Sequence, residues 1–135
     1  MIFGLGNDLA EVYRIEAALK KPKTGRKFQS RVFTEGEQRY CERRGKAKYQ
    51  SYAARFAAKE ATMKALGSGW GRYVGWKDVE VARKPGSRPQ LILHGKAREF
   101  AADKGISSLH LALTHTADLA EAHVVAEQGR PLSVR

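Results

Sequence analysis

Glu60 is the residue of this 135-residue chain that most directly suggests chemistry, because its carboxylate falls on an apolar helical stripe. The segment 51–66 is rich in alanine and lacks glycine and proline, which predicts a helix that ends at Gly67. At 3.6 residues per turn, Glu60 shares one face with Tyr52, Phe56, Met63 and Gly67. A carboxylate on a buried face is costly unless it is paired or binds a metal. Two interpretations follow: an ion pair with Lys64, one turn later, or a role as a metal ligand or base.

Asp8 supplies a second carboxylate from a different part of the chain. With Glu11 three residues later it resembles a capping box, so one interpretation is a helix N-cap. The other interpretation places it beside Glu60. Magnesium takes one or two protein carboxylates together with waters and phosphate oxygens, so two carboxylates from separate elements fit a magnesium–phosphate site.

Other polar residues near these carboxylates have two interpretations each. Arg55, Lys59 and Lys64 share the helix of Glu60, where they form either a solvated basic face or an anion site. The glycine-rich loop 67–71 has backbone amides for a phosphate, but it follows its helix and lacks the P-loop pattern, so an ordinary helix stop is the alternative. His115, at the end of an apolar strand, is by its local pattern structural or exposed.

The sequence argues against two other kinds of site. Cys41 has no cysteine partner nearby, and no two histidines have zinc-ligand spacing. No nucleophile-elbow pattern is present for a serine-based triad.

The elements that must position Asp8 and Glu60 can be predicted from local patterns. An apolar run at residues 2–5 predicts a strand, and the segment after it has apolar residues at helical spacing up to about Lys21. Thr34 and Glu37 form a second capping-box pattern, which predicts a short helix to about Arg44. In the second half a short helix is predicted around residues 97–101. Strands are predicted over residues 78–83, 91–93, 109–113 and 122–126. Helices in the first half and antiparallel strands in the second predict a single-domain α+β fold.

Composition restricts the partners. The net charge of +11 predicts anionic partners, such as a nucleic acid, an acidic protein or a phosphate-rich small molecule. No apolar run is long enough for a membrane span, and no basic-then-apolar pattern opens the chain. The single cysteine favours a reducing compartment. We therefore expect a cytoplasmic protein without a membrane partner.

Four segments of the chain, in order, resemble the holo-acyl-carrier-protein synthases, a family of phosphopantetheinyl transferases. They are residues 4–12 (GLGNDLAEV), 55–67 (RFAAKEATMKALG), 76–93 and 113–127. The central helix motif is the most specific of them. The resemblance implies a phosphopantetheinyl transferase-like α+β fold over residues 1–127, followed by a C-terminal tail over residues 128–135.

The resemblance also implies an activity and a set of site residues. Members transfer 4'-phosphopantetheine from coenzyme A to a serine of apo acyl carrier protein, giving 3',5'-ADP, with Mg²⁺, in support of fatty acid biosynthesis. Asp8 and Glu60 match the magnesium ligands and, with Lys64, are the expected catalytic residues. Glu60 or a metal-bound water would accept the serine proton. The positions that match the coenzyme A site are Arg55, Lys64, Gly67, Pro89, His115 and Thr116.

The partners implied by the resemblance are coenzyme A, an acidic carrier protein and two further copies of the chain. The carrier would dock on the first helix near Arg14 and on the basic stretch that follows. The homotrimer would share its sites, with Arg55 and His115 coming from different chains. Repulsion between chains of +11 charge requires an apolar interface, for which we expect the face of Leu109, Leu111 and Leu113 or that of Val124.

A small basic nucleic-acid-binding domain is the rival hypothesis. It explains the charge directly, but it leaves Glu60 unexplained, and the sequence contains no recognised nucleic-acid motif. We therefore expect no nucleic-acid partner.

Overall fold

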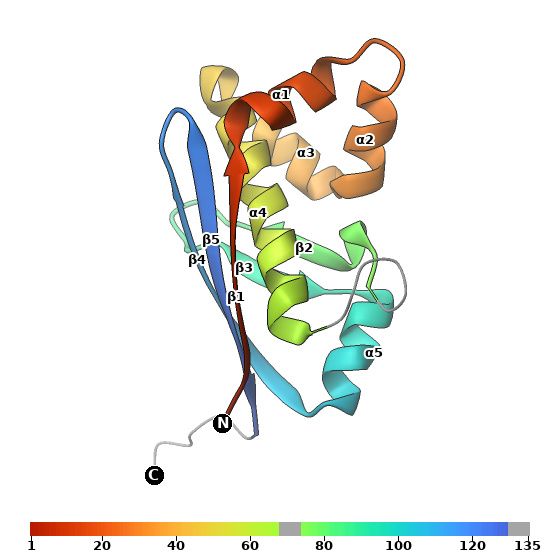
Figure 1. The fold of residues 1–135 in the computed structure, drawn as a ribbon, viewed down its shortest axis with the longest axis vertical. Helices are drawn as coiled ribbons and strands as arrows, with labels where there is room; N and C mark the ends of the chain where they lie inside the picture. The colour runs from red at the N-terminus through yellow and green to blue at the C-terminus, as the bar shows by residue number, and fades with distance from the viewer. Residues whose placement is uncertain (68–73, 130–135) are drawn as a thin grey trace.

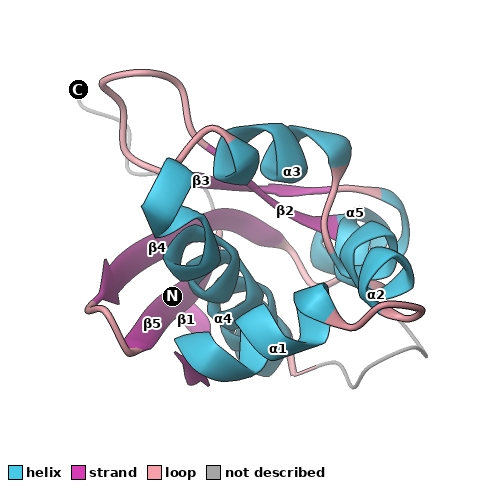
Figure 2. Ribbon diagram, turned by 90° about the horizontal axis from the view of Figure 1, so that it is seen from above, coloured by secondary structure: helices cyan, strands magenta, loops and turns pink. Residues whose placement is uncertain are grey.

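A long central helix, α4 (Lys48–Leu66), organises the fold. The computed structural model describes residues 1–67 and 74–129. The strands are β1 (Ile2–Glu11), β2 (Val79–Ala82), β3 (Gln90–Leu93), β4 (Ile106–His115) and β5 (Leu119–Gln128). α4 lies between a three-stranded antiparallel sheet of order β1-β5-β4 and an antiparallel pair of β2 and β3 (Figure 2). The expected α+β fold is confirmed.

The shorter helices cover the two ends of α4. They are α1 (Val12–Lys20), α2 (Gly25–Val32), α3 (Glu35–Glu42) and α5 (Gly95–Asp103), with 3₁₀ turns η1 (Gly45–Ala47) and η2 (Trp76–Asp78). Helices α1, α2 and α3 gather at one end, and α5 lies at the other, near the N-terminus (Figure 1). α2 was not predicted, because its first residue is a glycine and its sequence is mainly polar and basic.

Glycine and alanine bring β1 directly against α4. A Cβ atom on Gly4 would lie 1.9 Å from the carbonyl oxygen of Ala65, and one on Gly6 would lie 1.9 Å from that of Ala61. Ala61 and Ala65 are themselves buried. Only glycine fits at positions 4 and 6, so the backbone of β1 and the backbone of α4 are in contact.

The start of the first helix differs from the sequence prediction. Asp8 lies in β1, opposite Ala122 of β5, and α1 begins only at Val12. The Asp8–Glu11 capping box is therefore wrong: Glu11 is the N-cap residue, and its side chain makes no capping hydrogen bond. Pairing with β5, a contact distant in sequence, overrides the local pattern. The Thr34–Glu37 capping box is confirmed, with both of its hydrogen bonds present.

The leucine and valine faces expected at a subunit interface point toward the core of the single chain. Leu109, Leu111 and Leu113 pack against the core that includes α4, and Val124 is 1% exposed. Alternation in a strand places these side chains on the face that the helix covers. On β1 the side chains of Leu5 and Leu9 are instead exposed.

Two further features concern the predicted tail and the membrane. β5 continues to Gln128, and Gly129 donates a backbone hydrogen bond to Gly105, so the predicted boundary after residue 127 falls inside the strand. The rest of the predicted tail, residues 130–135, lies outside the described residues. Within the described ranges, no helix has the length and hydrophobicity needed to cross a bilayer.

Candidate active site

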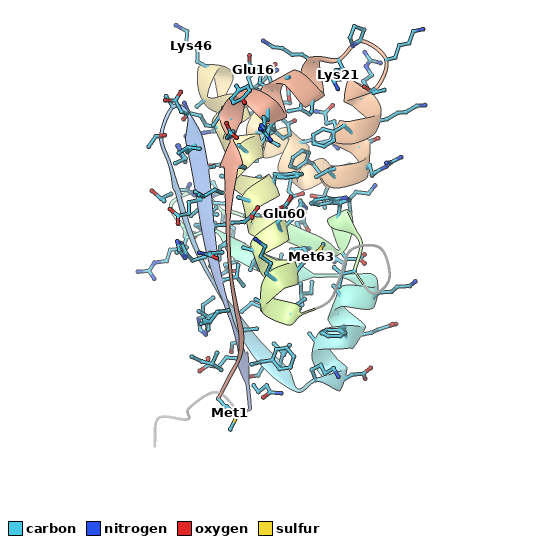
Figure 3. The ribbon with its side chains drawn as sticks, viewed as in Figure 1. Met1, Glu16, Lys21, Lys46, Glu60 and Met63 are labelled. Carbon is cyan, nitrogen blue, oxygen red and sulfur yellow. The ribbon has the colours of Figure 1, made fainter. Side chains whose placement is uncertain are left out.

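Asp8, Glu60 and Lys64 meet where β1 crosses α4. Asp8 faces the helix from the strand, and its side chain is 14% exposed. Lys64 donates to Asp8 Oδ1 at 3.0 Å and to the backbone oxygen of Asn7 at 3.2 Å. Glu60 lies one turn before Lys64, part of the way along α4 beside β1 (Figure 3). The three predicted catalytic residues are therefore neighbours.

Glu60 has an unusual protonation equilibrium. Burial, a hydrogen bond to the Asp8 carboxyl and the negative charge of Asp8 together raise the pKa of Glu60 to about 7, while the charge of Lys64 opposes them. The raised pKa shows that the two carboxyl groups are close enough to compete for charge. Lys64 forms its ion pair with Asp8, so the helical Glu60–Lys64 pair considered from spacing is not the arrangement found.

The two carboxyl groups fit a magnesium ion. Their oxygen donors are the type that Mg²⁺ prefers, and two close carboxylates that share a proton gain from a cation in its place. Across residues 1–67 and 74–129, no cluster of three or more His, Cys, Asp or Glu side chains has metal-binding geometry. A magnesium ion, which keeps several waters, needs no such cluster. Asp8 and Glu60 are thus the residues that would hold it.

Arg55 lies earlier on α4 and has an incomplete set of partners. It is 4% exposed, and its guanidinium stacks over the Tyr40 ring at 4.0 Å. It donates to the Ser51 carbonyl at 3.4 Å, and its Nε atom is buried without a hydrogen-bond partner in the described part of the chain. A buried guanidinium with an unused donor is suited to an anionic ligand.

A basic hollow lies beside Tyr40. Its volume is about 590 Å³, and its lining includes Arg39, Arg43, Arg44, Arg83 and Lys84. Arg83 donates to the Tyr40 hydroxyl at 3.4 Å, and Arg44 lies over the same ring. The prediction did not include Tyr40 or these arginines; the density of arginine at residues 39–44 was the signal available in the sequence.

Of the three cations on α4 that the sequence could place on a solvated face, only Lys64 is exposed. Lys64 has a side-chain exposure of 57%, whereas Arg55 and Lys59 are buried. Burial also lowers the pKa of Lys59, against the raising effect of Glu37.

The remaining predicted residues lie on other parts of the fold. Gly67 ends α4 with a φ of +72°, which favours glycine. The loop after it falls outside the described residues from position 68 to 73. Pro89 lies just before β3. His115 ends β4, and Thr116 Oγ1 accepts from the backbone N–H groups of Asp118 and Leu119 in the turn to β5. No hydrogen bond or ion pair among the described residues joins His115 or Thr116 to the carboxylates.

A second hollow of about 910 Å³ adjoins the carboxylate site. Its lining includes Lys64 and Gly67 together with residues of β1 and α5.

Cys41 is buried, and burial raises the pKa of its thiol to about 12. A thiol with so high a pKa is a poor nucleophile at neutral pH.

Comparison with known proteins places these residues in a family context. The profile of the 4'-phosphopantetheinyl transferase superfamily matches residues 4–125. The holo-[acyl-carrier-protein] synthase of Solibacter usitatus is 49% identical over 127 residues, which cover 94% of this chain and 99% of that protein.

Solved structures give the same result. The crystal structure of the holo-[acyl-carrier-protein] synthase from Neisseria meningitidis has a TM-score of 0.84 at 31% identity and covers 95% of this chain and 100% of its own. That from Bacillus anthracis, in complex with coenzyme A (3',5'-ADP), has a TM-score of 0.77 at 35% identity and covers 96% and 99%.

Proposed function

Because the chain belongs to the 4'-phosphopantetheinyl transferase superfamily, and within it to the holo-[acyl-carrier-protein] synthases, we propose a Mg²⁺-dependent reaction. In it, 4'-phosphopantetheine moves from coenzyme A to a serine of apo acyl carrier protein, and 3',5'-ADP is released. The product, a holo acyl carrier protein, would serve fatty acid biosynthesis. The observation that carries the proposal is the meeting of Asp8, Glu60 and Lys64 at one point of the fold.

The chemistry asked of these residues is charge neutralisation and proton transfer. The serine oxygen attacks the β-phosphorus of coenzyme A, and the bond from that phosphorus to the oxygen bridging to the α-phosphate breaks. Mg²⁺, held by Asp8 and Glu60, would neutralise charge on the pyrophosphate. Lys64, which is half-exposed, supplies a further cation to the same oxygens. Glu60, or a water bound to the ion, would accept the serine proton in this proposal.

Arg55 and the basic hollow support binding of the phosphates of coenzyme A. Arg55 has an unused buried donor, and the hollow beside Tyr40 adds several further cations. The structural relative from Bacillus anthracis holds coenzyme A (3',5'-ADP), which is a ligand of the same chemical class.

The surface of α1 and α2 supports docking of an acidic carrier protein. Arg14 is exposed and pairs with Glu11 at 3.3 Å, directly after the strand that carries Asp8. α1, α2 and the connection between them add exposed basic side chains, among them Lys20, Lys21 and Arg26, and Figure 3 shows Lys21 at the outer end of this helical layer. A negatively charged carrier would thus be drawn to the side on which the acceptor serine is needed.

A thermal-shift experiment tests the metal and coenzyme A together. Coenzyme A should raise the unfolding midpoint of the protein more in the presence of Mg²⁺ than with a chelator. In parallel, apo acyl carrier protein incubated with coenzyme A, Mg²⁺ and the protein should gain the mass of one phosphopantetheine group. A carrier that keeps its apo mass at high enzyme concentration would overturn the proposed function.

A further inference from the structure

Lys59, which precedes Glu60 in the sequence, is fully buried and binds partners on three elements, α3, η2 and β2. Its ammonium pairs with Glu37 Oε1 of α3 at 2.7 Å, and both side chains are 0% exposed. It also donates to the backbone oxygen of Trp76 in η2 at 3.1 Å and to that of Val79 at the start of β2. A lysine ammonium has three N–H donors, so each of them has an acceptor.

The carboxylate of Glu37 is equally occupied. Its Oε1 atom accepts from the backbone N–H of Thr34 at 2.8 Å, and its Oε2 atom accepts from that of Val81 at 2.8 Å. The Lys59–Glu37 pair therefore connects the first turn of α3, the strand β2 and the middle of α4. A second contact supports this connection, because Phe56 of α4 stacks on Trp76 with ring centroids 5.0 Å apart.

These contacts hold α4 on a different side from β1. Successive helical residues are about 100° apart around the axis, so Lys59 and Glu60 leave the helix in different directions. The backbone contacts of Gly4 and Gly6 with Ala65 and Ala61 fix the side of the helix that faces β1. The Lys59–Glu37 pair fixes the side that faces α3 and β2.

The direction of Glu60 depends on both sets of contacts. At a side-chain radius of about 5–6 Å, a rotation of α4 by about 20° would move a carboxylate by about 2 Å. Misplacement of catalytic groups by about 1 Å is enough to cost about a hundredfold in rate. A helix held on one side only is free to make such a rotation, whereas a helix held on two sides is not.

We propose that Lys59, through its ion pair with Glu37, is a positioning residue that fixes the rotation of α4 and thereby directs Glu60 toward Asp8. The inference rests on the proposed function, because it assigns Lys59 a role in a site that binds a divalent cation. Lys59 itself is buried away from the hollow beside Lys64 and contacts only protein groups among the described residues.

The test uses Mn²⁺ alone as the probe, bound to the full chain and followed by the electron paramagnetic resonance of the free ion. Lys59→Met should raise the dissociation constant for Mn²⁺ by about 10–100-fold, because Glu60 would no longer be held in the direction of Asp8. The kcat for transfer should fall, while the KM for the carrier protein stays the same, because α1 and α2 are unchanged.

Tyr52→Phe is the matched control. It lies on α4 and loses half-buried hydrogen bonds to Gln29 and Glu42, so it should reduce stability without altering Mn²⁺ affinity.

A double variant covers the case in which Lys59→Met does not fold. Lys59→Met with Glu37→Gln removes both charges, which is less destabilising than leaving one of them buried alone. The double variant should fold and still bind Mn²⁺ at least about tenfold more weakly than the natural chain. Natural Mn²⁺ affinity in the single or the double variant would overturn the positioning role and leave the proposed function intact. A natural chain that binds no Mn²⁺, with or without coenzyme A, would overturn the metal assignment and this inference with it.

Discussion

Lys64 of α4 reaches across to β1 and pairs with Asp8, with 3.0 Å between Nζ and Oδ1. Burial and the neighbouring Asp8 carboxyl raise the pKa of Glu60 to about 7, although the ammonium of Lys64 acts in the opposite direction. Without a further cation, the carboxylates of Asp8 and Glu60 carry more negative charge than the ammonium of Lys64 neutralises. Protonation of one carboxylate removes this excess. This balance is the physical basis of the first two predictions.

Removal of either carboxylate should abolish transfer and preserve the fold. Asp8→Ala and Glu60→Ala should each lower kcat by about 10²–10⁴-fold, because each removes a metal ligand or a base. Both residues are only partly buried, so the unfolding midpoint should change little. Glu60→Gln keeps the shape and removes the charge, and it should lose as much activity as the alanine variant. Glu35→Ala, at an exposed position of α3, is the control. Near-normal turnover of either variant at limiting Mg²⁺ would contradict the metal assignment.

Stability should depend on pH through Glu60. Its pKa is about 7 in the folded state, against an ordinary glutamate value of 4.5, so between these values the folded protein holds a proton that the unfolded chain has lost. Without Mg²⁺ the free energy of unfolding should therefore decrease as the pH rises through this window, with the loss complete above about pH 7. Mg²⁺ takes the place of the proton, so it should raise the unfolding midpoint more at about pH 8 than at about pH 5.5. In Glu60→Gln this difference should vanish. An equal effect of Mg²⁺ at both pH values in the natural chain would show that the ion does not replace this proton.

Charge reversal on α1 and α2 should weaken carrier binding. Changing Arg14, Lys20, Lys21 and Arg26 to glutamate should raise the KM for the carrier by about tenfold or more and flatten its dependence on salt, because screened attraction is lost. The KM for coenzyme A should stay the same. Arg98→Glu, a single charge reversal on the exposed face of α5, is the control for each of the four changes made singly. A changed constant for coenzyme A with an unchanged constant for the carrier would place the docking surface elsewhere.

Arg55 should act on coenzyme A and not on the carrier. Arg55→Met keeps much of the buried side chain against Tyr40 and removes the charge and the unused Nε donor. The KM for coenzyme A should rise by about 10–100-fold, which corresponds to the loss of one or two charge-assisted hydrogen bonds. Steady-state kinetics with each substrate varied in turn separates the two constants. If only the carrier constant moved, Arg55 would belong to the docking surface.

Activity should also depend on assembly. His115 ends β4 and Asp8 lies on β1, with β5 between them, so the two residues belong to opposite edges of one sheet. A trimer in which the edge of one chain meets the site of the next would bring such residues together. Mixing inactive Glu60→Ala and inactive His115→Ala proteins under conditions of subunit exchange should then restore part of the activity. Differently tagged chains verify the exchange. Mixed trimers without activity, formed from parents that each bind their own ligand, would exclude a shared site.

The sequence predicted those parts of the site that depend on local patterns. Glu60 was recognised because a carboxylate interrupts an apolar stripe of one helix, and the end of that helix at Gly67 follows from the preference of glycine for a positive φ. Thr34 and Glu37 are recognised as a capping box from their spacing of three residues. These signals lie within a few residues of one another, so no knowledge of the tertiary structure is needed to read them.

Contacts between distant segments account for what the sequence did not predict. The sequence leaves Asp8 with two interpretations, a helix cap or a partner of Glu60, because its pairing with β5 cannot be read from its neighbours. For Lys59 the sequence offers a solvated face or an anion site but not a buried ion pair, because its partner Glu37 lies on another helix. The inward direction of Leu109, Leu111 and Leu113 follows only from the position of α4 on the sheet.

The contact of Gly4 and Gly6 with the backbone of α4 has a consequence for how this enzyme can change. Side chains that pack by interdigitation can be exchanged for others of similar volume, but a main chain that lies against another main chain has no spare volume to redistribute. Variation that alters carrier choice can accumulate on α1 and α2 without moving β1 against α4. If carriers dock on α1 and α2 as proposed, the distance between the two carboxylates is insulated from the surface that selects the partner, and the chemistry can stay constant while the specificity diverges.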